Sequence, residues 1–196
     1  DEIIEMFQPK YLHLGHDEVA LVGRFPYRDS SIPYTMDELL EMDLRKYAEY
    51  LQGKQIGLML WSDMFLAPGD CLDAFNAKNM EESSRRRKML KQIQADYNLP
   101  ELIMQDWHYG ALPPDGFQSL EVWHQEQIKT LVSTWYVPGN LYGFIHRAIE
   151  ENALGLMHTT WAGWNFIVDK GEESWEQYAS YTLAADYSWS GRKEQP

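Results

Sequence analysis

The residues with the clearest capacity for chemistry are two adjacent acids, Asp17 and Glu18. They follow a short apolar run at residues 11–15, which predicts that they leave a buried strand together. Successive residues that leave a strand point in different directions, so the two carboxyl groups need not share one environment. Different environments can separate their pKa values, so that one group acts as a general acid and the other as a stabilising anion. The pair therefore indicates acid–base chemistry.

Tryptophans form the second group with a functional pattern. The chain has 8 Trp, 12 Tyr and 7 Phe, so 14% of its residues are aromatic, and many of them adjoin polar residues at the ends of apolar runs. The apolar face of an indole can bind sugar C–H groups and exclude water. A carboxylate pair surrounded by tryptophans predicts a carbohydrate site. The tryptophans expected there are Trp61, Trp107, Trp135 and Trp161.

Short apolar runs alternate with longer helical patterns, and these elements must position the site. The expected strands are residues 11–16, 56–61, 102–107, 130–136 and 154–161. The expected helices are residues 35–53, 82–97, 117–128, 140–152 and 174–187, of which the first and last begin with capping-box spacing. Strands that alternate with helices at this spacing pair in parallel through right-handed crossovers, which predicts the α/β class.

A (β/α)8 TIM barrel is favoured over a doubly wound sheet, because no glycine-rich phosphate motif follows any expected strand. A complete barrel takes about 250 residues. We therefore expect residues 1–196 to form a single domain, a partial barrel that holds the fourth to eighth strand–helix units. Residues 1–7 resemble the end of an amphipathic helix, which agrees with three missing units upstream. Open sheet edges would then favour a homo-oligomer that covers them.

Charge and composition exclude several kinds of partner. With 17 Lys+Arg against 30 Asp+Glu, the formal charge is −13, which gives no electrostatic footprint for nucleic acid or for an anionic membrane surface. No stretch approaches the roughly 18 apolar residues of a membrane span. Cys71 is the only cysteine, so it cannot form an intrachain disulfide, and its expected role is packing. The sequence leaves the cellular compartment undetermined.

Other polar residues are expected to have structural roles. The basic run at residues 85–88 should form the solvated face of its helix. His124 should lie at the surface and His158 in the core. His108, beside Trp107, fits either the lining of the site or a hydrogen-bonded structural position.

Residues 13–19, with the sequence HLGHDEV, resemble the H-x-G-G-D-E-[hydrophobic] signature of family 20 glycoside hydrolases, the β-N-acetylhexosaminidases. The later runs that carry a tryptophan at a strand end, residues 59–63, 105–107 and 159–161, are similar to the later barrel strands of that family. The resemblance covers most of the chain. It implies a hydrolase that removes terminal N-acetylhexosamine, GlcNAc or GalNAc, from an oligosaccharide or glycoconjugate, without a cofactor or metal.

The same resemblance implies substrate-assisted, retaining catalysis. Glu18 would protonate the glycosidic oxygen, and Asp17 would orient the substrate's acetamido group, whose carbonyl oxygen attacks the anomeric carbon to form an oxazolinium ion. His13 would support the acid pair, and Tyr136 would donate a hydrogen bond to the acetamido oxygen. The four tryptophans would line the N-acetyl pocket and contact the sugar ring.

The sequence departs from the family pattern at three places. His16 replaces a second glycine, Gly163 replaces a carboxylate that commonly follows the last strand's tryptophan, and Pro138 stands where an aspartate is expected. The family's sugar-binding arginine comes from the first barrel strand. An isolated piece without that strand would lack part of its subsite, and its activity is therefore in question.

Two other functions remain open. A noncatalytic carbohydrate-binding barrel would share the tryptophans but not need the acid pair. A metal-dependent hydrolase could use His13, His16 and Asp17 as ligands. His13 and His16 are three positions apart, and residues an odd number of positions apart lie on opposite faces of a strand. This disfavours chelation of one ion by both histidines.

Overall fold

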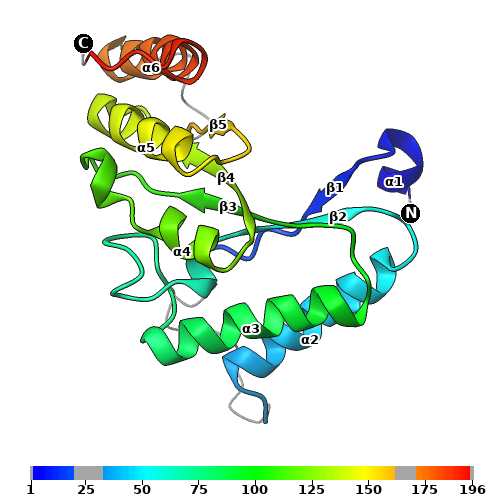
Figure 1. Cartoon of the computed structure of the whole chain (residues 1–196). Coiled ribbons are helices and arrows are strands. Elements are labelled where there is room, and N and C mark those ends of the chain that lie inside the picture. The colour runs from blue at the N-terminus through cyan, green and yellow to red at the C-terminus, as the bar shows by residue number, and fades with distance from the viewer. Residues whose placement is uncertain (1, 20–32, 162–170, 195–196) are drawn as a thin grey trace. The chain divides into compact units, whose positions relative to one another are not determined.

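The computed structural model describes residues 2–19, 33–161 and 171–194 (Figure 1). Within these residues, five parallel strands alternate with helices, and their order in the sheet is β1-β2-β3-β4-β5. The predicted α/β class is therefore confirmed. The strands are β1 (Tyr11–His13), β2 (Gly57–Trp61), β3 (Leu102–Trp107), β4 (Lys129–Thr134) and β5 (Leu156–His158).

Six helices and two short 3-10 turns connect or flank these strands in the described part of the chain. The helices are α1 (Glu2–Phe7), α2 (Met36–Leu51), α3 (Met80–Asp96), α4 (Ser119–Gln125), α5 (Pro138–Glu150) and α6 (Gly171–Ser190). The 3-10 turns are η1 (Asp63–Phe65) and η2 (Pro114–Gly116). Contacts between residues divide the chain into two compact units. Unit 1 contains Asp1–Gly69 and Phe75–Met104, and unit 2 contains Asp70–Ala74 and Gln105–Pro196.

Most predicted elements are found, with changes at their ends that local chemistry explains. The predicted capping box of α2 is present, with Thr35 and Glu38 bonded reciprocally. Helix α3 begins two residues earlier than expected because the Asn79 side chain accepts the backbone N–H of Glu82. Helix α5 begins at Pro138, a residue that suits the first turn because its ring fixes a helical φ. Ser174 lies inside α6 rather than before its first turn, so the expected cap there is wrong.

The core of unit 1 lies between the strands and two long helices. Helix α2 buries Leu40, Leu44, Ala48 and Leu51, which recur at helical spacing along one face. Alternate residues of β2, Leu58 and Leu60, are also buried. Each fully buried leucine side chain stabilises the folded state by about 1.5–3 kcal/mol.

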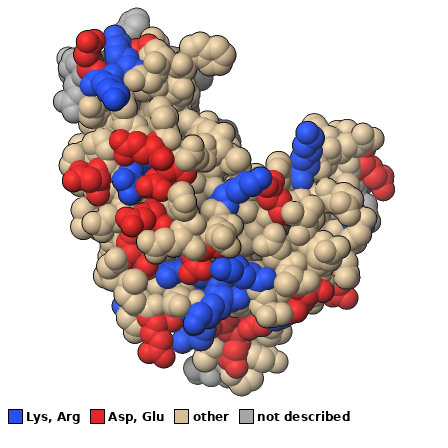
Figure 2. All heavy atoms as spheres, in the orientation of Figure 1, with Lys and Arg blue, Asp and Glu red and all other residues tan. Residues whose placement is uncertain are grey.

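The basic run on α3 is only partly solvated, so that prediction is wrong for two of its residues. Arg86 and Arg87 are 2% and 5% exposed, and they donate to the backbone oxygens of Met64 (2.7 Å) and Phe65 (2.9 Å). Both arginines lie within one helical turn of the buried Leu90, on the inner face of α3. Figure 2 shows basic side chains gathered over α3. Arg85 and Lys88 are the exposed residues of the run.

The core of unit 2 is built around α5. On one side, Phe144 stacks on Phe117 with ring centroids 4.6 Å apart, and Leu120 and Val132 complete the cluster. On the other side, residues of α5 pack against the buried Tyr187 of α6. The cluster around Phe144 joins α5 to β4, and thus fixes the strand that ends just before Trp135 and Tyr136. Cys71, assigned to unit 2, is buried, as its expected packing role requires.

Candidate functional site

The predicted site residues fall into two groups, and each is described within its own unit. His13, Asp17, Glu18 and Trp61 belong to unit 1. Trp107, Trp135, Tyr136 and Trp161 belong to unit 2.

In unit 1, the acid pair lies on a sharp turn that follows β1. The backbone φ is positive at Gly15 (76°), His16 (67°) and Glu18 (51°). These angles end the strand at His13, which explains why β1 is shorter than the predicted strand 11–16. Side chains with a Cβ rarely adopt such angles, at a cost of roughly 1–2 kcal/mol per residue. The surrounding structure must therefore hold this turn in place.

Backbone hydrogen bonds to β2 hold the start of this turn. Leu14 donates to the carbonyl oxygen of Met59 (2.9 Å), and Trp61 donates to that of Gly15 (3.1 Å). The backbone N–H of Gly15 also donates to Nδ1 of His13 (3.0 Å). His13 in turn packs edge-on against Trp61, with ring centroids 5.2 Å apart. These contacts give His13 a supporting position beside the turn.

The end of the turn is held by a residue to which the sequence analysis assigned no role. Asp63 follows β2, is fully buried, and accepts the backbone N–H of Glu18 on Oδ2 at 2.8 Å. The same oxygen accepts a hydrogen bond from the side-chain amide of Asn76. The position of Asp63 at the end of a strand was the one sequence signal that could have pointed to it.

The side chains of Asp17 and Glu18 themselves are exposed. The strand before them is half-buried at best, and Tyr11 at its start is 36% exposed. The expected buried strand is therefore wrong. It is wrong because β1 stands at one end of the strand order, where apolar side chains are less covered than in an inner strand.

Each of the two histidines near the turn has one ring nitrogen with another partner. Nε2 of His16 lies 2.8 Å from Oδ2 of Asp43, and Nδ1 of His13 accepts the N–H of Gly15. Within residues 2–19, 33–161 and 171–194, no group of three His, Cys, Asp or Glu side chains could hold a metal ion. The geometry of the described residues thus gives the metal-dependent alternative no support.

In unit 2, five aromatic residues form one continuous group, here called the aromatic cluster. Trp107 and Tyr109 have ring centroids 5.0 Å apart, Tyr109 and Trp135 are 5.5 Å apart, and Trp135 and Tyr136 are 4.4 Å apart. Nε1 of Trp161 donates to the hydroxyl of Tyr109 at 2.5 Å. Trp161 is 57% exposed. Tyr109 links the ends of three strands, although it was not among the predicted binding residues.

The buried side-chain amide of Asn140 supports the loops that carry the aromatic cluster. The side-chain oxygen of Asn140, in α5, accepts the backbone N–H of Trp135 at 3.0 Å. Its Nδ2 donates to the carbonyl oxygens of His108 (2.6 Å) and Gly110 (3.1 Å). Asn140 therefore connects the loops that follow β3 and β4, which carry Tyr109 and Trp135.

A buried charge network lies beside this amide. Both ring nitrogens of His108 have partners: Nδ1 faces Asp73, and Nε2 lies 2.7 Å from Oγ of Ser119. Ser119 donates to Oδ2 of Asp106 at 2.6 Å. Burial disfavours the charged imidazolium, but Asp106 and Asp73 outweigh that effect and raise the pKa of His108 to about 9.

The arrangement of Ser119, His108 and Asp73 resembles a Ser-His-Asp triad, but the chemistry differs. Ser119 gives its own proton to Asp106, and His108 already carries protons on both nitrogens at neutral pH, so it cannot act as a general base. Ser119 is also fully buried, beyond the reach of a substrate. His108 is buried and both of its ring nitrogens are hydrogen-bonded, which fits the structural position that was one of its two expected roles. His124, with its side chain 62% exposed, lies at the surface as predicted.

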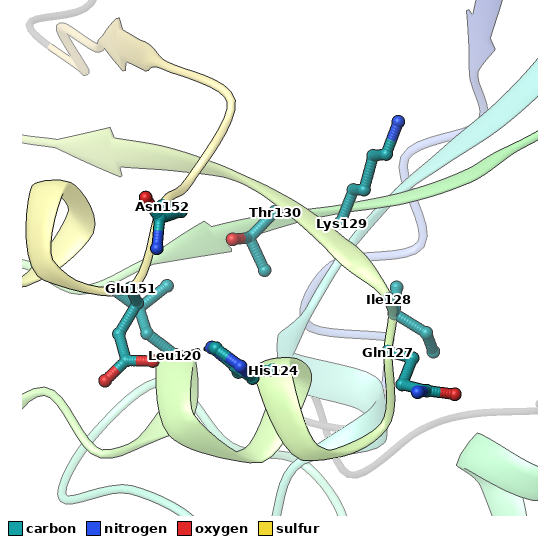
Figure 3. A pocket seen from close by; sticks show the side chains of 8 residues that line it. All are labelled: Leu120, His124, Gln127, Ile128, Lys129, Thr130, Glu151 and Asn152. Atoms are coloured by element: carbon teal, nitrogen blue, oxygen red, sulfur yellow. Dashed lines mark hydrogen bonds and ion pairs between the residues drawn. The ribbon is translucent and has the colours of Figure 1, made fainter.

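A pocket of about 300 Å³ lies at the opposite end of β4 from Trp135 (Figure 3). His124, Thr130 and Asn152 are among the residues that line it. Active sites of parallel α/β barrels lie at the carboxyl ends of the strands. This pocket adjoins the amino end of β4, so it does not belong to the predicted site.

Residues 162–170 lie outside the described part of the chain, and with them the family departure at Gly163. His158, which was expected in the core, is half-buried, and both of its ring nitrogens are bonded, to Thr134 (3.0 Å) and Ser180 (2.8 Å).

Neither a comparison with protein-family models nor a search of curated proteins finds a match to the chain. The likeness of residues 13–19 to the family 20 signature thus stays a prediction. Among the described helices, none combines the length and the apolar character that a membrane span requires.

Proposed function

We propose that this chain is part of a glycoside hydrolase that removes terminal N-acetylhexosamine from an oligosaccharide or glycoconjugate. The observation that carries the proposal is the acid pair, Asp17 and Glu18, exposed on a fixed turn at the carboxyl end of a parallel strand. We further propose that the five strand–helix units are the fourth to eighth units of a (β/α)8 barrel. In that architecture, the carboxyl ends of the strands bear the active site.

In this reaction, Glu18 donates its proton to the glycosidic oxygen as the bond from that oxygen to the anomeric carbon breaks. The acetamido carbonyl oxygen of the substrate attacks the anomeric carbon, and Asp17 accepts the acetamido N–H to orient it. Water then attacks the same carbon, Glu18 takes a proton from that water, and the oxazolinium ring reopens. The product keeps its anomeric configuration, because the carbon is attacked twice.

The aromatic cluster supports the assignment of a sugar substrate. Its rings are half-buried or exposed, and it presents indole and phenol groups at the ends of β3, β4 and β5. Flat apolar faces with polar edges suit a pyranose ring, which has apolar C–H faces and hydroxyl groups around its rim. Tyr136 is assigned to the acetamido oxygen, and His13 is assigned to support the acid pair.

The test of the acid pair is hydrolysis of an aryl N-acetylglucosaminide. Glu18→Gln keeps the size of the side chain but removes its titratable proton, and the expected loss in kcat is about 100-fold or more, in the range of general acid catalysis. Binding of a nonhydrolysable inhibitor should change little. Unchanged turnover in this variant would remove Glu18 from the proposed role.

The second part of this experiment compares substrates with and without the acetamido group. Substrate assistance predicts hydrolysis of the aryl N-acetylglucosaminide and none of the matching aryl glucoside. Asp17→Asn should lower the rate for the first substrate because the acetamide is no longer oriented by a charged acceptor. Equal rates on the two substrates would argue against substrate assistance.

A noncatalytic carbohydrate-binding protein is the second candidate, favoured by the aromatic cluster, which needs no acid pair. It predicts that the chain binds N-acetylglucosamine but hydrolyses no glycoside. Trp161→Ala should then weaken binding, measured by calorimetry, while Glu18→Gln should leave it unchanged. Hydrolysis that disappears in Glu18→Gln would exclude this candidate.

A further inference from the structure

The turn that carries the acid pair depends on one buried carboxylate oxygen. Oδ2 of Asp63 accepts the backbone N–H of Glu18, at a residue whose φ of 51° is unfavourable for any side chain with a Cβ. Asp63 lies 45 positions away along the chain from Glu18, so this contact exists only in the folded protein.

Asp63 is itself held rigidly. Its carbonyl oxygen accepts the backbone N–H groups of Asn76 (2.8 Å) and Leu66 (3.3 Å). The next two carbonyl oxygens, of Met64 and Phe65, are the acceptors of the two buried arginines of α3. The loop after β2 is thus fixed from α3 by two buried cations, and it presents one carboxylate to the turn.

One of these arginines extends the support to α2. Arg86 lies between Asp37, in the first turn of α2, and Glu82, one turn earlier in α3, with an N–O distance of 2.8 Å to Asp37. Burial favours the neutral form of Asp37, but Arg85 and Arg86 outweigh this and lower the pKa of its carboxyl group. The arginine charge therefore stays neutralised at neutral pH, which a 2% exposed guanidinium requires.

We propose that Asp63 is a positioning residue that fixes the backbone of Glu18, and thereby the direction in which the Glu18 carboxyl group leaves the turn. The effect of Asp63 on catalysis rests on the proposed function, whereas its effect on the backbone of Glu18 does not. Without the hydrogen bond, Glu18 returns to a negative φ, which rotates its Cα–Cβ bond. A misplacement of about 1 Å in a catalytic group can cost 100-fold in rate.

The first test needs no activity. Hydrogen exchange of the Glu18 backbone amide is measured by NMR in the wild type, Asp63→Ala and Asp63→Asn. We expect exchange to rise up to about tenfold in Asp63→Ala, the factor that corresponds to the loss of one intramolecular hydrogen bond. Asp63→Asn retains an oxygen that can accept the same N–H, so it should restore most of the protection. Unchanged exchange in Asp63→Ala would overturn the proposal.

Ser83→Ala is the matched control for general destabilisation. Ser83 is another fully buried polar residue of unit 1, and its hydroxyl donates to the carbonyl oxygen of Met80 (3.2 Å), within α3. Exchange at Glu18 should stay at the wild-type rate in this variant. A rise as large as that of Asp63→Ala would show that any loss of a buried polar group loosens the turn, and would also overturn the proposal.

The second test applies the same variants to hydrolysis of the aryl N-acetylglucosaminide. Asp63→Ala should lower kcat with little change in KM, because Asp63 does not touch the substrate, and Asp63→Asn should recover part of the rate. Altered exchange with no hydrolysis by the wild type would sink the proposed function but leave the positioning role. Normal hydrolysis together with faster exchange at Glu18 would overturn the catalytic consequence instead.

Discussion

His16 has a backbone conformation that is unfavourable for a histidine. Its φ is 67°, and Nδ1 of its ring is buried without a hydrogen-bond partner in the described structure. The family signature that residues 13–19 resemble has glycine here, which adopts this φ without steric cost. The contact of His16 with Asp43 compensates only in part, since a partly exposed polar contact of this kind contributes about 0–1 kcal/mol.

A pair of substitutions isolates the cost in stability of the positive φ at residue 16. His16→Gly and His16→Ala both remove the imidazole and its contact with Asp43, but only glycine accepts a φ of 67° without strain. We expect His16→Gly to be the more stable variant, by about 1 kcal/mol. Urea denaturation of the two variants measures the difference. Equal stability, or a more stable alanine variant, would show that the turn relaxes when the histidine is removed.

At this scale, the sequence predicted residue types better than their surroundings. The acids and tryptophans were proposed because their chemistry is visible in a single chain. Asp63 and Tyr109 were not assigned, since their roles come from partners 45 and 52 positions away. The burial of Arg86 was missed for the same reason: a basic residue normally predicts solvent, and its buried partners, Asp37 and the Met64 carbonyl, lie elsewhere in the sequence.

At the scale of elements, the end of β3 is unusual because it buries a cation. The folded-state pKa of His108, about 9, lies above the value of 6.5 for a free histidine. Protonated His108 therefore stabilises the fold fully below pH 6.5, and this stabilisation is lost as the pH rises through about 9. The carboxyl group of Asp73 is shifted in the complementary direction. Burial would raise its pKa, but hydrogen bonds and charge from His108 outweigh this effect and lower the pKa.

This predicts that the free energy of unfolding falls between about pH 6.5 and pH 9. The expected loss is up to about 3 kcal/mol, from the relation between a pKa shift and stability. Urea denaturation across this pH range measures it. His124→Gln, which removes a histidine with a 62% exposed side chain, should leave the pH dependence intact, whereas His108→Gln should abolish it. A flat wild-type profile would contradict the assigned charge.

Element prediction succeeded where the signal was local. Helix α2 was recognised from a capping box and a regular apolar face, both of which lie within the helix itself. Strand β3 was predicted with its observed ends because it begins with three consecutive apolar residues and ends in a tryptophan, and it lies inside the strand order, where all but its last residue are buried. Strands β1 and β5 are three residues each, shorter than predicted, and both stand at the ends of the strand order.

At the scale of the whole molecule, those two terminal strands make the proposal of an oligomer testable. In the described part of the chain, β1 is followed by β2 alone in the sheet order, and β5 is preceded by β4 alone. Strands with an unpaired edge associate with other strands. We expect the purified chain to form oligomers whose mass rises with concentration in sedimentation experiments. A monodisperse, thermally stable monomer would contradict this expectation.

The assignment of residues 70–74 to unit 2 has a practical consequence for dissecting the protein. Unit 1 is encoded on both sides of this short segment, which also contains Asp73, the partner of His108. A fragment that starts after Met104 would leave His108 without one of its two carboxylates. No single cut of the polypeptide can therefore yield both units intact. A circular permutant or a co-expressed peptide that contains residues 70–74 would be needed to produce unit 2 with both carboxylates of His108.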